Sequence, residues 1–386
     1  MPMNENPDKR KRGKRRLIGI AGSFLSLIVL IYIAVMLISG RQSELFRFIN
    51  SSSDRTAIVM ADEYHFDVGR NRVFADLDGA VAAAGTLGIQ VLDAGGSETL
   101  RDSFRMTEPV IKALEGRAVT FDIGGTDLRV FNDTGIIASI EAEGVVVSAS
   151  INRNGWTAVC SQREAGTLKG VVAVYNSSGK LAYRVNMVTG YVLSAALSPD
   201  NKSLAILNLT DAGSRITFYN LDSEDAVRVY EMPGRLLLDI RYLTDGNVLA
   251  ISTESLLVVD KNNEGGLYYL FTDRRLGGFV LDGDFITLYL LDYGVGHRGR
   301  LVTIGEDGSI LGEIETDREI ISLSSNDGIL SVLRSDGLVF YDTTLVELQT
   351  SANSASVAGA TIVLSLNGGY ALVAGDHSAI VIRIES

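Results

Sequence analysis

The sequence predicts an all-β protein: a β-propeller of about eight four-stranded blades, preceded by one N-terminal transmembrane helix. A turn-and-strand pattern that recurs about every 42 residues predicts the blades. An uninterrupted apolar segment near the N-terminus predicts the helix. The composition of the 386 residues, 46% hydrophobic and 21% charged, excludes a disordered chain. Beyond residue 55 no stretch has the apolar period of a long amphipathic helix, so we expect the body to be all-β.

The transmembrane helix is predicted over residues 17–39, which contain no charged side chain. At about 1.5 Å per residue this segment reaches about 34 Å, enough to cross a hydrocarbon core of about 30 Å. Basic residues cluster just before it, so the positive-inside rule predicts a cytoplasmic N-terminus and an extracytoplasmic body, in a single-pass protein of the cell membrane. A cleaved signal peptide is the alternative, but its apolar stretch would span only about 7–15 residues and end in a small-residue cleavage site. Residues 36–40 (MLISG) fit such a site poorly, which favours an uncleaved signal anchor.

Charge is distributed unevenly along the chain. Seven basic and two acidic side chains give the basic tail, residues 1–16, a net charge of +5; since the whole chain carries −12, the remainder carries −17. Nucleic-acid binding needs Lys and Arg to displace the counterions of the phosphates, so we expect no nucleic-acid partner. Residues 40–55 are polar and turn-rich, typical of a short spacer, and residues 56–386 form the predicted propeller.

Eight repeated units make up the predicted propeller. Each has a turn rich in Asp, Asn and Gly that leads into a strand rich in Ala, Val, Leu and Ser, over residues 76–85, 114–123, 152–161, 198–207, 243–252, 281–290, 325–334 and 366–375. A second strand follows each of these elements. The strands are apolar runs, as expected for blades that stack face to face and bury both sides of their inner strands. Asp and Asn before Gly suit hairpins, because they tolerate the positive φ of tight turns.

The ring is expected to close through an N-terminal strand. The last unit supplies three strands, at 359–366, 369–375 and 380–386, and residues 63–68 (EYHFDV) are similar to outer strands such as 182–187. We therefore expect residues 63–68 to complete the last blade as its outermost strand, which pairs an otherwise open edge. A ring of seven blades is the alternative, if residues 71–105 are not a separate blade.

The repeated element, clearest in residues 198–207 (SPDNKSLAIL), resembles the element shared by WD-repeat-like, quinoprotein-like and translocation-protein-like propellers. The order of basic tail, single anchor and propeller is similar to that of an uncharacterised family of membrane-anchored bacterial propellers. The resemblance covers about 330 residues, implies the fold, and transfers no functional residue. Quinone-dependent propellers repeat a docking motif with a tryptophan in most blades, whereas this chain has Trp156 alone, and it lacks the Trp-Asp dipeptide of true WD repeats. We expect no quinone or other cofactor, and we expect Trp156 to pack at the end of its blade.

Motifs for catalysis or metal binding are few. The chain has neither the G-x-S-x-G of a nucleophile elbow nor a phosphate-binding G-x-x-x-x-G-K-[ST]. The single cysteine, Cys160, is expected to be a small buried hydrophobe, and the three histidines match no metal-ligand spacing. The acidic pairs Asp76/Asp78 and Asp282/Asp284 could bind calcium, but the full ligand loop is missing, which favours a role as turn caps. No catalytic or metal-binding residue is assigned.

The candidate binding site lies on the hairpins between the two central strands of each unit. These hairpins are longer at 162–170, 209–216 and 292–300, and in a four-stranded blade they open onto one face. Repeat proteins often build binding sites from insertions confined to one face, although neutral drift of loop length is the alternative. The predicted ligand-binding residues are Arg163, Glu164, Lys169, Arg215, His297, Arg298 and Arg300. Their basic share suits an anionic envelope polymer or an acidic protein surface.

The sequence leads to two hypotheses for the function, a binding module and an enzyme. The anchor, the rigid disc and the few catalytic motifs favour a membrane-anchored extracytoplasmic propeller that acts as a binding or scaffolding module in the cell envelope. Its partners would be the lipid bilayer, through residues 17–39, and an envelope protein or polymer, through the propeller loops. The alternative is an envelope hydrolase or lyase with an acidic site in the central channel, since a propeller can host an enzyme at its axis.

Overall fold

The computed structural model describes residues 60–163, 167–260, 264–281, 283–294, 296–352, 357–375 and 379–384. The predicted basic tail, transmembrane helix and spacer lie outside these ranges, as do Glu164 and Asp282. Within the described ranges, no helix is long and apolar enough to cross a membrane.

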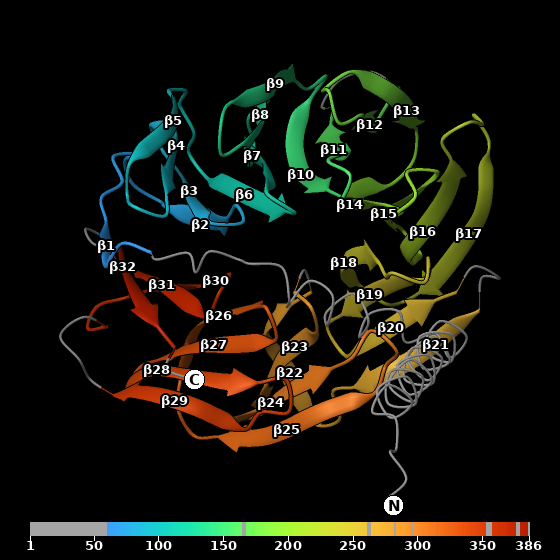
Figure 1. Ribbon diagram of the computed structural model, residues 1–386. Coiled ribbons are helices and arrows are strands. Elements are labelled where there is room, and N and C mark those ends of the chain that lie inside the picture. Colours follow the sequence, from blue (N-terminus) through green and yellow to red (C-terminus); the bar gives the residue numbers. More distant parts are fainter. Residues whose placement is uncertain are drawn as a thin grey trace, which may run out of the picture. The chain divides into compact units, whose positions relative to one another are not determined.

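Eight antiparallel sheets of four strands follow one another around a ring (Figure 1). Blade 1 contains β2 (Val73–Asp76), β3 (Ala80–Gly85), β4 (Gly88–Asp93) and β5 (Glu98–Asp102), and blade 2 contains β6 (Pro109–Leu114), β7 (Arg117–Asp122), β8 (Asp127–Asn132) and β9 (Ile136–Glu141). Blade 3 contains β10 (Val145–Ile151), β11 (Thr157–Gln162), β12 (Gly170–Tyr175) and β13 (Leu181–Met187). Blade 4 contains β14 (Tyr191–Leu197), β15 (Ser203–Thr210), β16 (Gly213–Asn220) and β17 (Ala226–Pro233). Blade 5 contains β18 (Leu237–Tyr242), β19 (Val248–Ser252), β20 (Ser255–Val259) and β21 (Gly265–Leu270), and blade 6 contains β22 (Arg274–Val280), β23 (Ile286–Asp292), β24 (Gly299–Ile304) and β25 (Ile310–Thr316). Blade 7 contains β26 (Ile320–Asn326), β27 (Ile329–Arg334), β28 (Gly337–Asp342) and β29 (Glu347–Ala352). Blade 8 contains β30 (Ile362–Leu366), β31 (Tyr370–Ala374), β32 (Ala379–Arg383) and β1 (Glu63–Tyr64). The predicted eight blades are confirmed, and because β2–β5 form a complete sheet, the seven-bladed alternative is wrong.

The first strand of each blade is the innermost. First strands of neighbouring blades contact one another around the axis, as β14 contacts β18 and β22 contacts β26. The recurring turn-and-strand element of the sequence is the second strand, which pairs with the first and third strands of its own sheet. In β3 all residues of the segment AVAAAG are buried. Burial on both sides explains why these strands are continuous apolar runs.

β1 occupies the outer edge of blade 8. It pairs antiparallel with β32, with Glu63 opposite Ile380 and Tyr64 opposite Ala379. Figure 1 shows this meeting of the blue and red ends of the ring. The Tyr64 side chain is buried, and its Oη donates a hydrogen bond of 2.9 Å to the carbonyl oxygen of Ala94 in blade 1. This strand therefore takes the position expected for residues 63–68, and its tyrosine ties blade 8 to blade 1.

The first strands of blades 3 to 7 each contain a β-bulge near their start. One residue of each strand is left out of the register with the second strand: Val147, Leu193, Leu238, Gly277 and Ile321. A bulge re-aims the side chain of the extra residue and increases the local twist. Leu238 and Ile321 are exposed at these positions.

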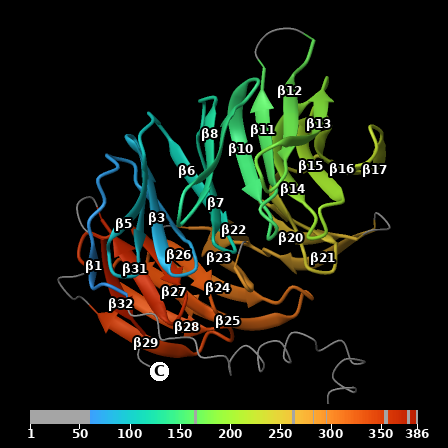
Figure 2. The ribbon, with the colours of Figure 1, turned by 45° about the horizontal axis from the view of Figure 1, so that its top comes forward.

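The strand order gives the propeller two faces. We call hairpin face the side that carries the connections between second and third strands and the connections between consecutive blades. We call turn face the opposite side, which carries the turns between first and second strands and between third and fourth strands. Figure 2, tilted by 45°, shows the strands of each blade running between these two sides.

Acidic and amide side chains of the turn face link neighbouring blades. Asn367 Nδ2 donates to Asp78 Oδ1 at 2.8 Å, which joins blades 8 and 1, and the Gly328 amide donates to Asp284 Oδ2 at 3.0 Å, which joins blades 7 and 6. Asp78 has a φ of 56°, which Asp tolerates better than most residues. Asp78 and Asp284 thus serve as turn residues and as hydrogen-bond acceptors between blades, whereas Asp76 lies on strand β2. In the described part of the chain, no three His, Cys, Asp or Glu side chains gather in a group that could hold a metal ion.

Cys160 and Trp156 lie in the core shared by blades 3 and 4. Cys160 on β11 is fully buried, and burial raises the pKa of its thiol to about 12, so the thiol stays protonated at neutral pH. Trp156 is partly buried and packs against the same apolar cluster. Both residues have the packing roles that the sequence predicted.

Candidate binding face

The three hairpins that the sequence singled out differ in structure. Residues 163–169 join β11 to β12, and residues 293–298 join β23 to β24. Only Asp211 and Ala212 join β15 to β16, because the ladder continues to the pair Thr210 and Gly213. The expectation of a longer loop at 209–216 is therefore wrong, since the extra residues extend both strands. Gly213 makes this turn possible with a φ of 134°, which a residue with a Cβ rarely adopts.

Arg215 and Arg300 lie on strands and not in loops. Arg215 is on β16, and its Nε lies 2.7 Å from Glu231 Oε1 on the neighbouring strand β17. Arg300 is on β24, and its Nη2 lies 2.7 Å from Glu315 Oε1 on β25. Opposite charges on adjacent strands stabilise the pairing of a sheet, here at the outer edges of blades 4 and 6.

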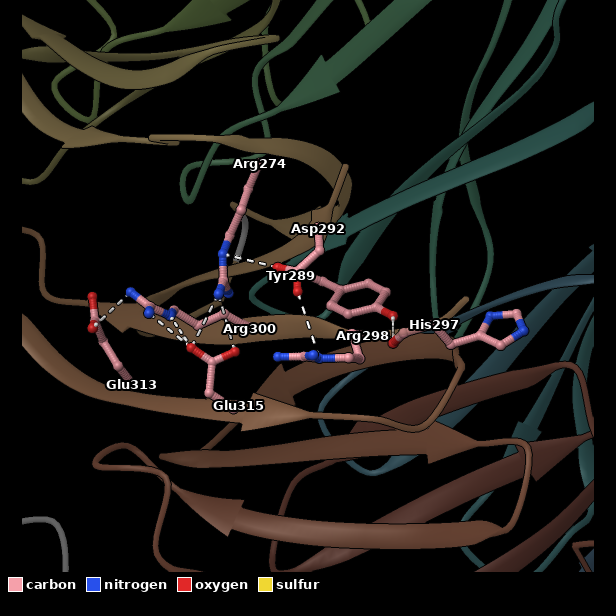
Figure 3. Close-up of polar contacts among 8 residues, drawn as sticks. All are labelled: Arg274, Tyr289, Asp292, His297, Arg298, Arg300, Glu313 and Glu315. Atoms are coloured by element: carbon pink, nitrogen blue, oxygen red, sulfur yellow. Dashed lines mark hydrogen bonds and ion pairs between the residues drawn. The ribbon is translucent and has the colours of Figure 1, made fainter. Parts of the chain in front are cut away.

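In blade 6, Arg300 belongs to a chain of alternating charges (Figure 3). Arg274 Nη2 also binds Glu315, at 3.1 Å, while Arg274 Nε lies 3.2 Å from Asp292 Oδ1. Asp292 Oδ2 in turn lies 3.7 Å from Arg298 Nε. Burial opposes the ionisation of Glu315, but the hydrogen bonds from Arg300 and Arg274 outweigh it and hold the pKa of Glu315 below its ordinary value. The hydrogen bond to Glu315 likewise raises the pKa of Arg300, so both partners of this pair favour their ionised forms.

The other predicted residues lie at the surface of the hairpin face. His297 Nε2 is 3.8 Å from Glu319 Oε2, and Arg163 Nη1 is 4.0 Å from Glu143 Oε2. The backbone of Lys169 pairs with that of Arg163 across the base of the hairpin, through an N–H···O bond of 3.1 Å. An exposed ion pair such as that of Arg163 with Glu143 is worth only about 0–1 kcal/mol, so a partner can replace it at little cost.

The predicted residues share one face but do not converge on one point. Arg163 and Lys169 belong to blade 3, Arg215 belongs to blade 4, and His297, Arg298 and Arg300 belong to blade 6. Among the described contacts, none joins these three groups to one another. They therefore form separate charged patches around the ring.

Reasoning from charge in the sequence missed the apolar side chains of the hairpin face. We use the name apolar set for six exposed residues of this face: Val188, Tyr191, Leu236, Leu238, Tyr293 and Ile321. They lie near the starts of first strands, in connections between blades, or in the β23–β24 hairpin. Their exposed fractions range from 37% to 71%. No turn between first and second strands has an exposed large apolar side chain within the described ranges. Those turns instead carry acidic residues: Asp78, Glu115, Asp200, Asp245, Asp284 and Asp327. For Val188 and Leu236 a signal was present in the sequence, because they lie between a fourth strand and the next first strand, where polar turn residues are usual.

Around the axis, the first strands carry two acidic residues, Asp76 and Asp239. Asp239 on β18 accepts a hydrogen bond of 2.7 Å from Ser194 Oγ and lies 3.8 Å from Lys112 Nζ on β6. Asp76 on β2 accepts a hydrogen bond of 3.0 Å from Asn326 Nδ2. Burial, and then the nearby carboxylate of Asp78, raise the pKa of Asp76 to about 6. The two carboxylates have separate partners and do not form a coupled acid–base pair.

Eight four-stranded blades around one axis define an eight-bladed β-propeller. The chain belongs to the family of unknown function DUF5711, whose model matches residues 55–344. None of the curated proteins matches it.

Several solved structures share the fold. The C-terminal WD40 domain of Sif2 is 14% identical, with a TM-score of 0.60 over 84% of this chain and 97% of that one. The quinohemoprotein alcohol dehydrogenase ADHIIG from Pseudomonas putida HK5 is 12% identical, with a TM-score of 0.50 over 83% of this chain and 72% of that one. AztD from Citrobacter koseri is 13% identical, with a TM-score of 0.50 over 73% of this chain and 86% of that one. The resemblance to WD-repeat-like and quinoprotein-like propellers is thus confirmed for the fold, and at these identities for the fold alone.

Proposed function

We propose that this chain is a membrane-anchored propeller that binds a partner outside the cytoplasm through its hairpin face, as a binding or scaffolding module of the cell envelope. The exposed apolar set of the hairpin face carries this proposal. The side chains of the apolar set are exposed to water and do not cover a core. The turns between first and second strands, on the opposite side, carry acidic residues in their place. Apolar groups surrounded by polar ones are typical of protein–protein interfaces.

The basic residues of the hairpins would form the rim of this interface. Arg163, Lys169, Arg298 and His297 are partly or fully exposed on the same face as the apolar set. Rim charges affect the rate and specificity of association more than its affinity. A partner with carboxylates or phosphates at its edge and apolar side chains at its centre fits both features, which favours an envelope protein over a purely anionic polymer. The net charge of −17 beyond residue 16 argues against a nucleic acid.

Residues 17–39 would anchor the propeller in the bilayer, with residues 1–16 in the cytoplasm. The uncharged apolar stretch and the basic cluster before it support this topology. Protease added to intact protoplasts should then degrade the propeller and leave a small fragment that contains the anchor. Protection of the whole chain, in protoplasts that the protease is shown to reach, would contradict the extracytoplasmic location.

One observation favours the alternative, an envelope hydrolase or lyase with an acidic site at the axis. The pKa of Asp76, raised to about 6, would suit a general acid or base near neutral pH. Asp76 has no described catalytic partner beyond Asp78 and Asn326, so this function remains second. Replacing Asp76 by Asn would abolish an activity of this kind and leave partner binding on the hairpin face unchanged.

The experiment that tests the binding proposal uses crosslinking in intact cells. The variant Tyr191→Ser/Leu238→Ser/Ile321→Ser removes apolar area from the hairpin face without touching the buried core. The control Val346→Ser removes a side chain of 60% exposure from a turn between third and fourth strands, on the turn face. Wild type and control should capture the same partner, and the triple variant should lose most of it at an unchanged melting temperature. Equal capture by all three proteins would show that the interface does not lie on the hairpin face.

A further inference from the structure

A cavity of about 440 Å³ lies beside blade 1, among residues that are not part of the apolar set. Its wall comes from the segment after β1, from the β3–β4 hairpin, and from the end of β5 with the connection that leads to β6. Small-molecule sites typically enclose about 300–1,000 Å³. The cavity is therefore large enough for one small organic molecule.

Apolar side chains form much of the cavity wall. Val68 and Ile89 are almost fully buried, while Leu87 is 56% exposed at the tip of the hairpin. Phe104 is held in place from outside the cavity, because the Arg129 guanidinium carbon lies 4.4 Å from the centre of its ring. Arg129 is itself fixed by Asp102, with Nε 2.8 Å from Oδ2. The apolar wall is thus pre-formed, which lowers the cost of binding.

The polar side of the wall is also fixed in place. Arg101 Nη2 lies 2.8 Å from Glu98 Oε2, and its Nη1 donates to the carbonyl oxygen of Asp67 at 3.2 Å. The buried Gln90 supports both partners: its Oε1 accepts from the Asp67 amide at 2.8 Å, and its Nε2 donates to Glu98 Oε2 at 2.7 Å. The charge of Arg101 is therefore largely balanced by its own neighbours.

Arg105 differs from the other charged residues of the cavity. It is exposed at the cavity wall, and no carboxylate of the described chain lies within ion-pair distance of its guanidinium. An uncommitted guanidinium beside an apolar wall matches a ligand with one anionic group and a compact apolar body, since guanidinium binds carboxylate through two parallel hydrogen bonds. We propose that this cavity binds a small amphiphilic anion, with its carboxylate on Arg105 and its apolar body against Val68, Ile89, Leu87 and Phe104. The cavity lies on the hairpin face at blade 1, apart from the apolar set, and this proposal does not rest on the proposed function.

The test is a calorimetric titration of the full chain in lipid nanodiscs, with empty nanodiscs subtracted, using 2-naphthoate and its neutral counterpart 2-naphthamide. Wild type should bind 2-naphthoate at one saturable site. Arg105→Gln should weaken binding at least tenfold, and Leu87→Ala should weaken it severalfold; both residues are exposed, so the melting temperature should not change. The matched control is Arg235→Gln, which removes an exposed arginine from the equivalent connection between blades 4 and 5.

The control should bind 2-naphthoate as wild type does, and 2-naphthamide should bind more weakly and be insensitive to Arg105→Gln. The triple variant of the apolar set should also bind 2-naphthoate normally, so a failure of the proposed function and a failure of this site can be told apart. Absence of saturable binding to wild type would overturn the proposal. Equal affinity of Arg105→Gln and wild type, or an equal loss in Arg235→Gln, would also overturn it.

Discussion

Lys112 Nζ lies 3.8 Å from Asp239 Oδ2, although the two residues belong to blades 2 and 5, which are not neighbours in the ring. The contact therefore spans the interior of the propeller. Ser194 of blade 4 donates a hydrogen bond to the other oxygen of the same carboxylate. Three innermost strands are thus joined through one aspartate.

We expect this ion pair to couple the stabilities of distant blades. Both side chains are about 30% exposed, so Lys112→Met and Asp239→Asn should each lower the free energy of unfolding by roughly 1 kcal/mol. In the double variant the loss should fall short of the sum by about 0.5–1 kcal/mol, as measured by urea denaturation. Lys180→Met, at the start of an outer edge, serves as the control. Strictly additive losses would mean that the pair contributes nothing across the ring.

Closure of the ring depends on Tyr64. Replacing this buried tyrosine by Ala should cost about 3–5 kcal/mol, as for other large aromatic residues in cores. Tyr64→Phe removes only the hydrogen bonds of the hydroxyl, to the Ala94 carbonyl oxygen and to Met60 Sδ, and should cost about 1 kcal/mol. Deleting residues 56–70 should lower the melting temperature of the propeller sharply, because it leaves β32 with an unpaired edge. Unchanged melting of the deletion variant would show that blade 8 does not need this strand.

The raised pKa of Asp76 predicts how the stability of the protein depends on pH. Its pKa of about 6 in the folded state exceeds its value of 3.8 in the unfolded chain, so between these values the folded state binds more protons. Stability from this group is therefore present below about pH 4 and is lost as the pH rises to about 6. Asp76→Asn should remove this loss and make the protein more stable than wild type at pH 7, by roughly 1–3 kcal/mol. Parallel stability curves for the two proteins between pH 4 and 7 would contradict the raised pKa.

The triple variant Arg163→Gln/Arg215→Gln/Arg298→Gln tests three arginines of the hairpin face, two from the rim and one from strand β16. The ion pairs of these arginines are largely exposed, so the fold should remain intact, with a loss of about 0.5 kcal/mol or less for each substitution. Association with the partner should slow, and its dependence on salt should weaken, because fewer exposed charges are screened. Binding kinetics at two salt concentrations provide the measurement. Identical salt dependence in wild type and variant would show that these arginines do not contact the partner and act only within their own blades.

The blades could be predicted because their signals are local and repeated. A turn with Asp or Asn before Gly and a run such as AVAAAG both follow from the φ of a tight turn and from burial on two sides. The outer strand was predictable from its likeness to other outer strands, although only Glu63 and Tyr64 join the ladder.

The binding face was harder to predict, because it depends on contacts between strands far apart in sequence. The residues of 209–216 gave no sign that Thr210 and Gly213 would continue the ladder. Nor could spacing show that Arg300 and Arg274 share Glu315, or that bulges expose Leu238 and Ile321. Such pairings arise only when a third and a fourth strand align, which no local pattern specifies.

Site-specific photocrosslinking in living cells tests the central claim most directly. A photoreactive amino acid is placed at Tyr293, 71% exposed on the hairpin face, and in a second strain at Val346, 60% exposed on the turn face. We predict that light yields one defined adduct from position 293, that the adduct disappears in the Tyr191→Ser/Leu238→Ser/Ile321→Ser background, and that position 346 yields none. The same adduct from position 346, or an adduct from position 293 that persists in the triple variant, would contradict binding through the hairpin face.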